Sequence, residues 1–211
     1  MFKNRVEAGK QLAKRLLKYK DRNVVVLAIP RGGLPIGAIV SKALSAPLDV
    51  VLTKKIGHPF HKEYAIGAVN LEDVILTDTI GIEQEYIDSA IIKIRERLKD
   101  LYLQYYKNRL PIPIEEKTVI LIDDGIATGN TIMATIALLI KQKPRRIIVA
   151  VPVAPISAIR KLEKHPYVND VICMLESNNF KAVGQFYDVF DQVTNKEAIR
   201  LLEENMITKK I

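Results

Sequence analysis

Two adjacent carboxylates, Asp123 and Asp124, follow an apolar run and precede a loop rich in glycine and threonine. The whole string, Val119 to Thr131, reads VILIDDGIATGNT. Ionised carboxylates accept hydrogen bonds, so they suit the vicinal hydroxyls of a sugar better than a phosphate or an apolar core. Glycines let the backbone approach a phosphate closely, and the N–H groups at a helix start form an anion site. The string therefore predicts one site for a ribose and its 5′-phosphate.

Within this string, Asp123 and Asp124 are the candidate catalytic residues that hold the ribose. The candidate phosphate-binding residues are the seven that follow: Gly125, Ile126, Ala127, Thr128, Gly129, Asn130 and Thr131. The structural alternative is a plain strand–turn–helix connection with an N-capping Asp or Thr. The match to a phosphate loop along the entire string favours the binding interpretation.

The string resembles the phosphoribosyl-pyrophosphate (PRPP) loop of type I phosphoribosyltransferases, and the resemblance extends over roughly residues 24–190. It implies transfer of a phosphoribosyl group from PRPP to a nitrogenous base, with release of pyrophosphate. It also implies Mg²⁺ as a cofactor that is held mostly through substrate oxygens.

The turn Pro30-Arg31-Gly32-Gly33 is similar to the turn that binds the leaving pyrophosphate in this family. The resemblance assigns Arg31 a catalytic role, because its fixed donors suit a polyanion. Gly32 and Gly33 would expose backbone amides to the same group. Taken alone, a pair of glycines is an ordinary turn former.

Lys54 and Lys55 match the basic position that follows the second strand in the family, where a mobile loop begins. The resemblance makes Lys55 a catalytic residue and Lys54 a substrate-binding residue. It makes residues 54–63 a flexible lid that excludes water. His58 and His61 lie in this segment, and the sequence leaves open whether they take part in chemistry.

The tail KAVGQFYDVF, residues 181–190, resembles the end of purine phosphoribosyltransferases, where an acid follows the Gly of a Val-Gly pair by four residues. Gly184 and Asp188 fit that spacing, which makes Asp188 a candidate metal ligand. Phe186 or Tyr187 is a candidate platform for stacking on a base. The alternative is that these aromatic side chains belong to the core.

Ala127 stands where oxopurine enzymes carry an Asp that acts on the purine ring. The Ala-Thr-Gly here resembles adenine phosphoribosyltransferases, so a purine-like acceptor is favoured. The loop supplies no evident general base, and the sequence leaves both this base and the acceptor open.

Strands that alternate with helices predict an α/β fold with a mostly parallel central sheet flanked by helices. We expect a small C-terminal or hairpin hood at 176–211, and a long helix at 82–108 inserted before the strand of the PRPP loop. The strands of the sheet are expected at 24–30, 48–53, 118–122, 145–153 and 170–175. A hairpin is expected from 65–69 and 73–77, and a polar loop over 54–63.

The long helix carries an apolar seam with alternating spacings of four and three, formed by Ile87, Ile91, Ile94, Leu98, Leu101 and Tyr105. Amphipathic helices usually face the core of their own domain, so we expect the seam to pack there. The alternative is a subunit contact, since relatives are often dimers and a homodimer is expected.

Composition supports one globular domain over residues 1–211, with 48% hydrophobic and 27% charged residues. The single cysteine, the absence of a secretory signal pattern and the absence of a membrane span predict a cytoplasmic protein with no membrane partner. The net charge is +8, and residues 1–23 hold eight Lys or Arg against two acids. Such a balance favours anionic partners.

Two other functions compete with the transferase. One is a non-catalytic PRPP-sensing or nucleotide-sensing regulator that binds nucleic acid, which the basic N-terminus permits, although no helix-turn-helix pattern is present. Nucleic acid is therefore kept as a partner class but is not favoured. The other is a dinucleotide-binding domain, which ranks low because G-x-G-x-x-G is missing after the first strand.

Overall fold

The computed structural model describes residues 1–61, 64–107 and 109–205, which form two compact units. The first unit comprises Met1–Val51, Ile112–Thr128 and the chain from Pro144 onward, and the second comprises Leu52–Pro111 and Gly129–Lys143. The single domain over 1–211 and the hood over 176–211 stay predictions, and residues 206–211 of the hood lie outside the described residues.

A five-stranded parallel sheet forms the centre of the first unit, in the order β2-β1-β6-β7-β8. Its strands are β1 (Val24–Ala28), β2 (Leu48–Val50), β6 (Thr118–Ile122), β7 (Arg146–Pro155) and β8 (Asp170–Ser177). Every residue of β1, β2 and β6 is buried, as expected for parallel strands covered on both faces. The predicted α/β class with a mostly parallel sheet is confirmed.

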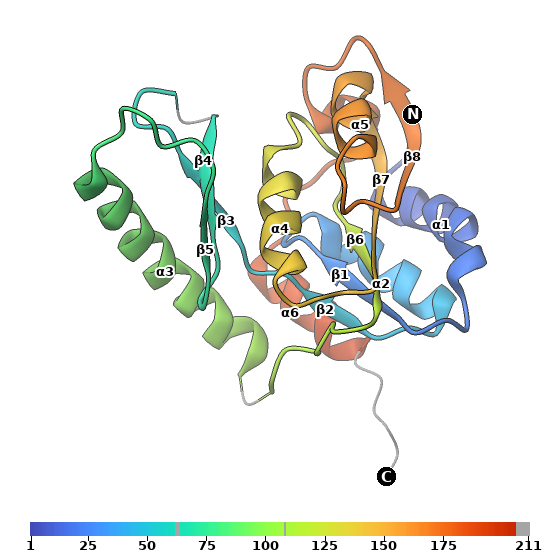
Figure 1. The fold of residues 1–211 in the computed structure, drawn as a ribbon. Coiled ribbons are helices and arrows are strands. Elements are labelled where there is room, and N and C mark those ends of the chain that lie inside the picture. Colours follow the sequence, from blue (N-terminus) through green and yellow to red (C-terminus); the bar gives the residue numbers. More distant parts are fainter. Residues whose placement is uncertain (62–63, 108, 206–211) are drawn as a thin grey trace. The chain divides into compact units, whose positions relative to one another are not determined.

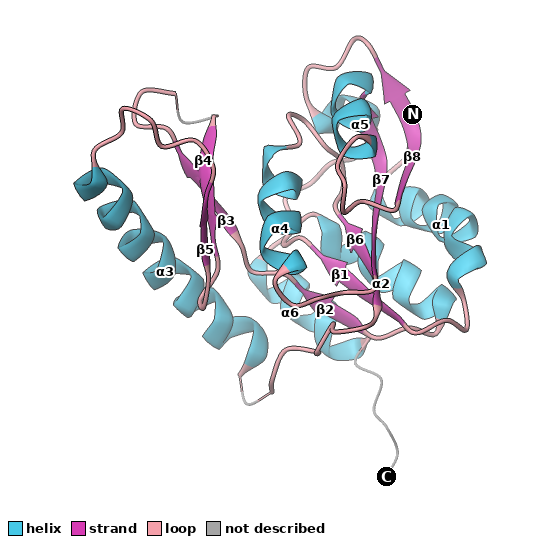
Figure 2. Ribbon diagram, viewed as in Figure 1, coloured by secondary structure: helices cyan, strands magenta, loops and turns pink. Residues whose placement is uncertain are grey.

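Helices cover both faces of this sheet (Figures 1 and 2). They are α1 (Arg5–Leu16), continued by the 3₁₀ turn η1 (Leu17–Tyr19), α2 (Gly33–Leu44), α5 (Ile156–Glu163) and α6 (Asn195–Glu204). The helices α1 and α2 pack on one face, and α6 packs beside α2. Right-handed crossovers place α5 on the opposite face, because the chain leaves β1 toward one edge and β7 toward the other.

The strand order creates a switch point between β1 and β6. From β1 the chain moves outward to β2, and the strands after β6 continue in the opposite direction to β7 and β8. Ligands of open α/β sheets bind in the crevice at the carboxyl ends of such a pair of strands. The residues that follow β1 and β6 are therefore the ones that the fold offers to a ligand.

The second unit contains an antiparallel three-stranded sheet with two helices. Its strands are β3 (Lys54–Gly57), β4 (Ala65–Val69) and β5 (Val74–Leu76), and its helices are α3 (Gln84–Tyr106) and α4 (Asn130–Ile140). The predicted hairpin of β4 and β5 is confirmed. The predicted polar loop over 54–63 is wrong for Lys54–Gly57, because these residues pair with β4 and fully bury Ile56. Residues 62–63 of this segment lie outside the described residues.

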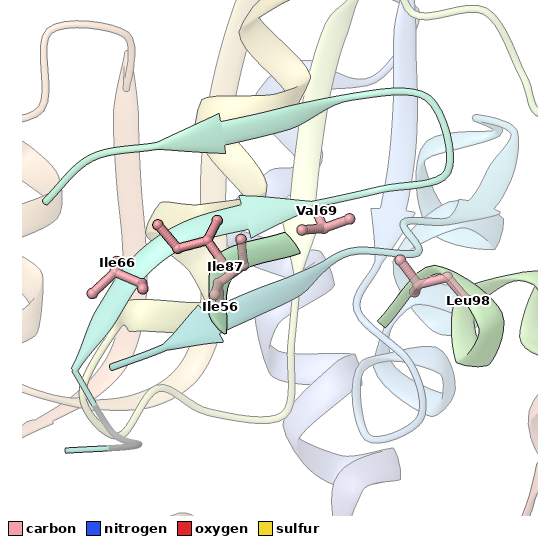
Figure 3. Close-up of a cluster of buried hydrophobic side chains, with 5 residues drawn as sticks. All are labelled: Ile56, Ile66, Val69, Ile87 and Leu98. Carbon is pink, nitrogen blue, oxygen red and sulfur yellow. The ribbon is translucent and has the colours of Figure 1, made fainter. Parts of the chain in front are cut away.

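The long helix α3 packs its apolar seam against the sheet of its own unit. Figure 3 shows Ile87 and Leu98 of α3 beside Ile56 of β3 and Ile66 and Val69 of β4, all five at most 1% exposed. The expectation that the seam faces its own core is confirmed at these positions. Asn108, the last residue of the predicted helix 82–108, lies outside the described residues.

None of the helices in the described part of the chain has both the length and the apolar character needed to cross a bilayer.

Candidate active site

The predicted pyrophosphate turn and the predicted ribose-binding acids meet at the switch point of the first unit. The N–H of Ile29, just after β1, donates to the carbonyl of Ile122 at the end of β6 over 2.8 Å. A Cβ at Gly32 would overlap the carboxylate of Asp124, and one at Gly33 would lie 2.6 Å from the carbonyl oxygen of Ile122. Two loops that are far apart in sequence therefore touch at positions where any added side chain would displace the opposite loop.

A pocket of about 440 Å³ opens at this contact. It is lined by residues from the N-terminus, both loops and the C-terminal tail: Arg5, Arg31, Gly32, Asp124, Val183, Phe190, Gln192 and Val193. Arg31 is half-buried, with its Nη1 3.4 Å from Oδ1 of Asn195 in α6. The pocket thus combines two guanidinium groups with a carboxylate, which suits a ligand that carries both anionic groups and hydroxyls.

Burial and a neighbouring charge determine the electrostatics of Asp123. Its Oδ1 accepts a hydrogen bond from the backbone N–H of Asp124 over 2.9 Å. Burial raises the pKa of the Asp123 carboxyl well above its usual range, and the negative charge of Asp124 raises it further. Asp123 therefore keeps its proton to a higher pH than an ordinary carboxyl group does.

Asp124 is held by Arg5, a residue to which no motif in the sequence assigns a role. The Nε and Nη2 atoms of Arg5 lie 2.9 and 2.8 Å from Oδ2 of Asp124, and Nη1 donates to the carbonyl of Asp191 over 2.7 Å. The guanidinium carbon lies 3.8 Å from the centre of the Phe190 ring, within the range of a cation–π contact. Arg5 belongs to the basic N-terminal run, and no pattern in the sequence separates it from the other lysines and arginines there.

Tyr187 supports the backbone of the acid pair. Its hydroxyl donates to the carbonyl of Asp124 over 2.6 Å, and burial raises its pKa, so the hydroxyl stays a donor. The ring is 6% exposed and lies against Phe2 and Phe190, with centroids 5.6 and 4.9 Å away. Stacking of Tyr187 on a base stays a prediction, and the aromatic ring that lines the pocket is that of Phe190.

The other two tail candidates lie in or next to the 3₁₀ turn η2 (Val183–Phe186). Phe186 is half-buried and stacks on Phe180 at 5.2 Å. Asp188 is exposed, and its backbone N–H donates to the carbonyl of Phe2 over 2.9 Å. The base-stacking and metal-binding roles of these two residues stay predictions.

Residues 125–128, which follow the two acids in the PRPP-loop string, also belong to the first unit. A Cβ at Gly125 would lie 2.6 Å from the Val183 side chain, so the backbone here is closely packed. The N–H of Ile126 donates to the carbonyl of Val153 over 2.9 Å. Ala127 and Thr128 are exposed. This segment is therefore anchored at its start and accessible at its end.

The remaining predicted site residues belong to the second unit. Gly129 has a left-handed φ of 77° and precedes α4, whose first turn contains Asn130 and Thr131. The first N–H groups of a helix lack partners within the helix, so this turn can donate to an anion. Lys54 and Lys55 open strand β3, the first exposed and the second half-buried.

His58 and His61 line a separate pocket of about 290 Å³ in the second unit, together with Tyr64, Asp78 and Ile80. The two imidazole rings lie 5.6 Å apart, and Tyr64 donates to Asp78 over 2.6 Å. The structure thus gathers Arg31, Gly32, Gly33 and residues 123–128 within the first unit, while the lysines and histidines belong to the second.

Comparisons with known proteins identify the family. The phosphoribosyl transferase domain family matches residues 3–190, and the chain belongs to this family. The Mycobacterium tuberculosis protein Rv0571c, provisionally named a phosphoribosyl transferase, is 34% identical over 208 residues. That match covers 96% of this chain and 46% of Rv0571c, so the chain spans about half the length of this relative.

Two further relatives cover most of their own length. The crystal structure of TT1426 from Thermus thermophilus superposes with a TM-score of 0.88 at 32% identity, covering 97% of this chain and 99% of that one. The uracil phosphoribosyltransferase of Mycoplasma genitalium is 28% identical over 174 residues, which are 76% of this chain and 82% of that protein. The resemblance seen in the sequence is thereby confirmed at the level of the family.

Proposed function

We propose that the protein transfers the 5-phosphoribosyl group of PRPP to a nitrogenous base and releases pyrophosphate. The contact of the Asp123–Asp124 pair with the Gly32–Gly33 turn carries this proposal. It sets a pair of hydroxyl acceptors beside a turn with exposed amides and a guanidinium group, and PRPP carries its ribose hydroxyls next to its pyrophosphate.

In the proposed reaction, a nitrogen of the acceptor forms a bond to C1 of the ribose while the bond from C1 to the pyrophosphate oxygen breaks. The electron pair of the broken bond leaves with pyrophosphate, and the acceptor nitrogen gives up a proton. Asp123 and Asp124 would hold the ribose hydroxyls. Arg31, with Lys54 and Lys55 of the second unit, would stabilise the charge on pyrophosphate.

The remaining loop residues would bind the 5′-phosphate. Gly129 and the first turn of α4 are the donors in this proposal, with the hydroxyls of Thr128 and Thr131 beside them. The segment 54–63 is proposed as the lid that keeps water away from C1, because water would compete with the acceptor.

Magnesium is the proposed cofactor. Mg²⁺ keeps several waters and would take most of its other ligands from oxygen atoms of the substrate, so it would need few ligands from the protein. Asp188 is the proposed protein ligand, and the ion would neutralise charge on pyrophosphate.

The acceptor is proposed to be purine-like because of Ala127, and one relative, named a uracil phosphoribosyltransferase, adds pyrimidines to the candidates. The protein is proposed to be cytoplasmic and to form a homodimer.

The test is a pyrophosphate-release screen with PRPP and Mg²⁺ against a panel of purines and pyrimidines. We expect release with one class of base, and loss of release in the double variant Asp123→Asn and Asp124→Asn, with the fold retained. A double variant that consumes PRPP at the normal rate would show that the site is assigned wrongly.

A PRPP-sensing regulator that binds nucleic acid is the second candidate, because α1 and η1 expose several cations that take no part in the pocket: Lys10, Lys14, Arg15 and Lys18. Binding through such cations weakens steeply with salt. A salt-dependent gel shift, together with no pyrophosphate release with any base, would favour this candidate over the transferase.

A further inference from the structure

The first residues of the chain are fixed against the C-terminal tail. The N–H of Phe2 donates to the carbonyl of Phe186 over 2.8 Å, and the carbonyl of Phe2 accepts from Asp188 over 2.9 Å. The carbonyl of Lys3 accepts from Val189 over 3.0 Å. Phe2 is only 2% exposed, so the segment of residues 1–4, called the N-terminal strap below, is packed against the tail.

The strap delivers Arg5 to the pocket in a defined orientation. Asn4 is the N-cap of α1, and its Oδ1 accepts from the N–H groups of Val6 and Glu7 over 3.0 and 3.1 Å. Arg5 is thus the first residue of the helix, so its backbone is fixed from both sides. A side chain that starts from a fixed backbone loses less conformational entropy when it forms an ion pair.

The ion pair between Arg5 and Asp124 limits the movement of both side chains. Two nitrogens of Arg5 reach a single oxygen, Oδ2, and the side chains are only 12% and 14% exposed. The third nitrogen bonds to Asp191, and the plane of the group lies against Phe190. Exposed ion pairs contribute little because both partners can move, but here one partner is held at three points.

Arg5 uses only one of the two carboxylate oxygens of Asp124. Both of its contacts end on Oδ2, and the Asp123 carboxyl also lies within hydrogen-bonding reach of the Asp124 side chain. Gly32 lies against the same carboxylate, and Tyr187 holds its backbone carbonyl. We infer that Arg5 is a positioning residue that fixes Asp124 so that Oδ1 faces the ribose, which makes the N-terminal strap part of the candidate active site. This inference rests on the proposed function.

Arg5→Gln is the informative variant, because it keeps a long polar side chain and removes the charge and the planar fork. We expect PRPP affinity, measured by calorimetry with Mg²⁺, to fall about 10- to 100-fold, on the scale of a hydrogen bond to a charged group. Arg5→Lys should recover part of the loss, because it restores the charge without the fork. Arg15→Gln removes one charge from an exposed position of the same helix and should bind as the wild type does.

A purely structural role for Arg5 predicts a different pH profile. The charged and titratable groups that face Asp124 are Arg5, Arg31, Asp123 and Tyr187. The charge of Arg5 lowers the pKa of the Asp123 carboxyl, so loss of this cation should make Asp123 harder to ionise, and PRPP binding should fail at a higher pH on the acid side. A general loosening would instead lower affinity by the same factor at every pH, with Arg5→Lys no better than Arg5→Gln, and would overturn the inference.

An experiment without PRPP separates this inference from the proposed function. The carboxyl ¹³C resonance of Asp123, followed by NMR against pH in the free protein, should titrate at a higher pH in Arg5→Gln than in the wild type, because the Arg5 charge lowers the pKa of this carboxyl. If the wild type bound no PRPP, the proposed function would fail, and the titration would still decide whether the Arg5 cation is held against the acid pair. Identical titrations in the two proteins would overturn the inference, as would PRPP affinity of the variant within twofold of the wild type.

Discussion

Gly32 lies so close to the carboxylate of Asp124 that a methyl group on its Cα would overlap Oδ2 of that carboxylate. The turn after β1 and the acids after β6 are therefore a single packed unit. Any side chain at position 32 has to displace Asp124, the same residue that Arg5 and Tyr187 hold.

Gly32→Ala is predicted to abolish measurable PRPP binding and to lower the free energy of unfolding by about 1–3 kcal/mol, the usual cost of forcing extra atoms into a packed site. Calorimetry with PRPP and Mg²⁺ and urea denaturation measure the two effects. Gly81→Asn serves as the control, because Gly81 has open space around it and Asn tolerates its positive φ. Normal PRPP binding by Gly32→Ala would contradict the close contact.

The raised pKa of Asp123 predicts how stability depends on pH. The folded state binds this proton more tightly than the unfolded state, so the contribution is full below the ordinary carboxyl pKa of 3.8 and is lost as pH rises through the higher folded value. Asp123→Asn removes this titration. The variant should therefore lose less stability than the wild type as pH is raised from about 4 toward neutrality.

Urea denaturation at several pH values checks this expectation. Asp100→Asn, an exposed acid on α3, provides the matched control and should follow the wild-type curve. Parallel pH curves for Asp123→Asn and the wild type would mean that Asp123 titrates normally in the folded protein.

The sequence predicts those features of the fold that depend on neighbouring residues, and it fails where a contact joins residues that are far apart in the chain. Uninterrupted apolar runs predict the strands β1 and β6, because parallel strands are buried on both faces. The Gly- and Thr-rich run after β6 predicts the turn that leads into α4, and the binding role of that turn stays a prediction. The polar composition of residues 54–63 predicts a loop, but Lys54–Gly57 forms a strand because it pairs with β4, a contact that the local sequence does not indicate. Arg5 was missed because its partner lies 119 residues away, and no local pattern encodes such a contact.

Tyr187 shows the same limit in the tail. Its position after the Val-Gly pair leaves a ligand platform and a core residue as alternatives. The structure gives its ring two aromatic neighbours and its hydroxyl the carbonyl of Asp124, and stacking on a base stays a prediction. The aromatic side chain that reaches the pocket, Phe190, ends the same segment. Which ring of this segment reaches the pocket depends on how residues 1–4 pack against it, and no local pattern in the sequence encodes that packing.

Substitutions on the buried and exposed faces of α3 should differ greatly in their effect on the free energy of unfolding. Leu98 is fully buried against the sheet of the second unit, and Ile92 is 60% exposed. Leu98→Ala should lower the free energy of unfolding by about 2–5 kcal/mol, because it leaves a cavity in the core. Ile92→Ala should change it by less than about 0.5 kcal/mol, as exposed substitutions usually do. Urea denaturation compares the two, and equal costs would contradict the packing of α3.

Asp49 is a carboxylate in the middle of β2, and it is only 1% exposed. Its Oδ1 accepts from the N–H of Val50 over 2.8 Å, and its Oδ2 accepts from the N–H of Ile112 over 2.7 Å. It thereby fixes the segment that leads into β6, the strand that Asp123 and Asp124 follow.

An amide cannot accept with both ends, so Asp49→Asn leaves one of the two N–H groups facing another donor. We expect a loss of about 1–3 kcal/mol in urea denaturation, against no measurable change for Asp100→Asn. Wild-type stability for Asp49→Asn would show that the hydrogen bond to Ile112 does not hold this segment in place.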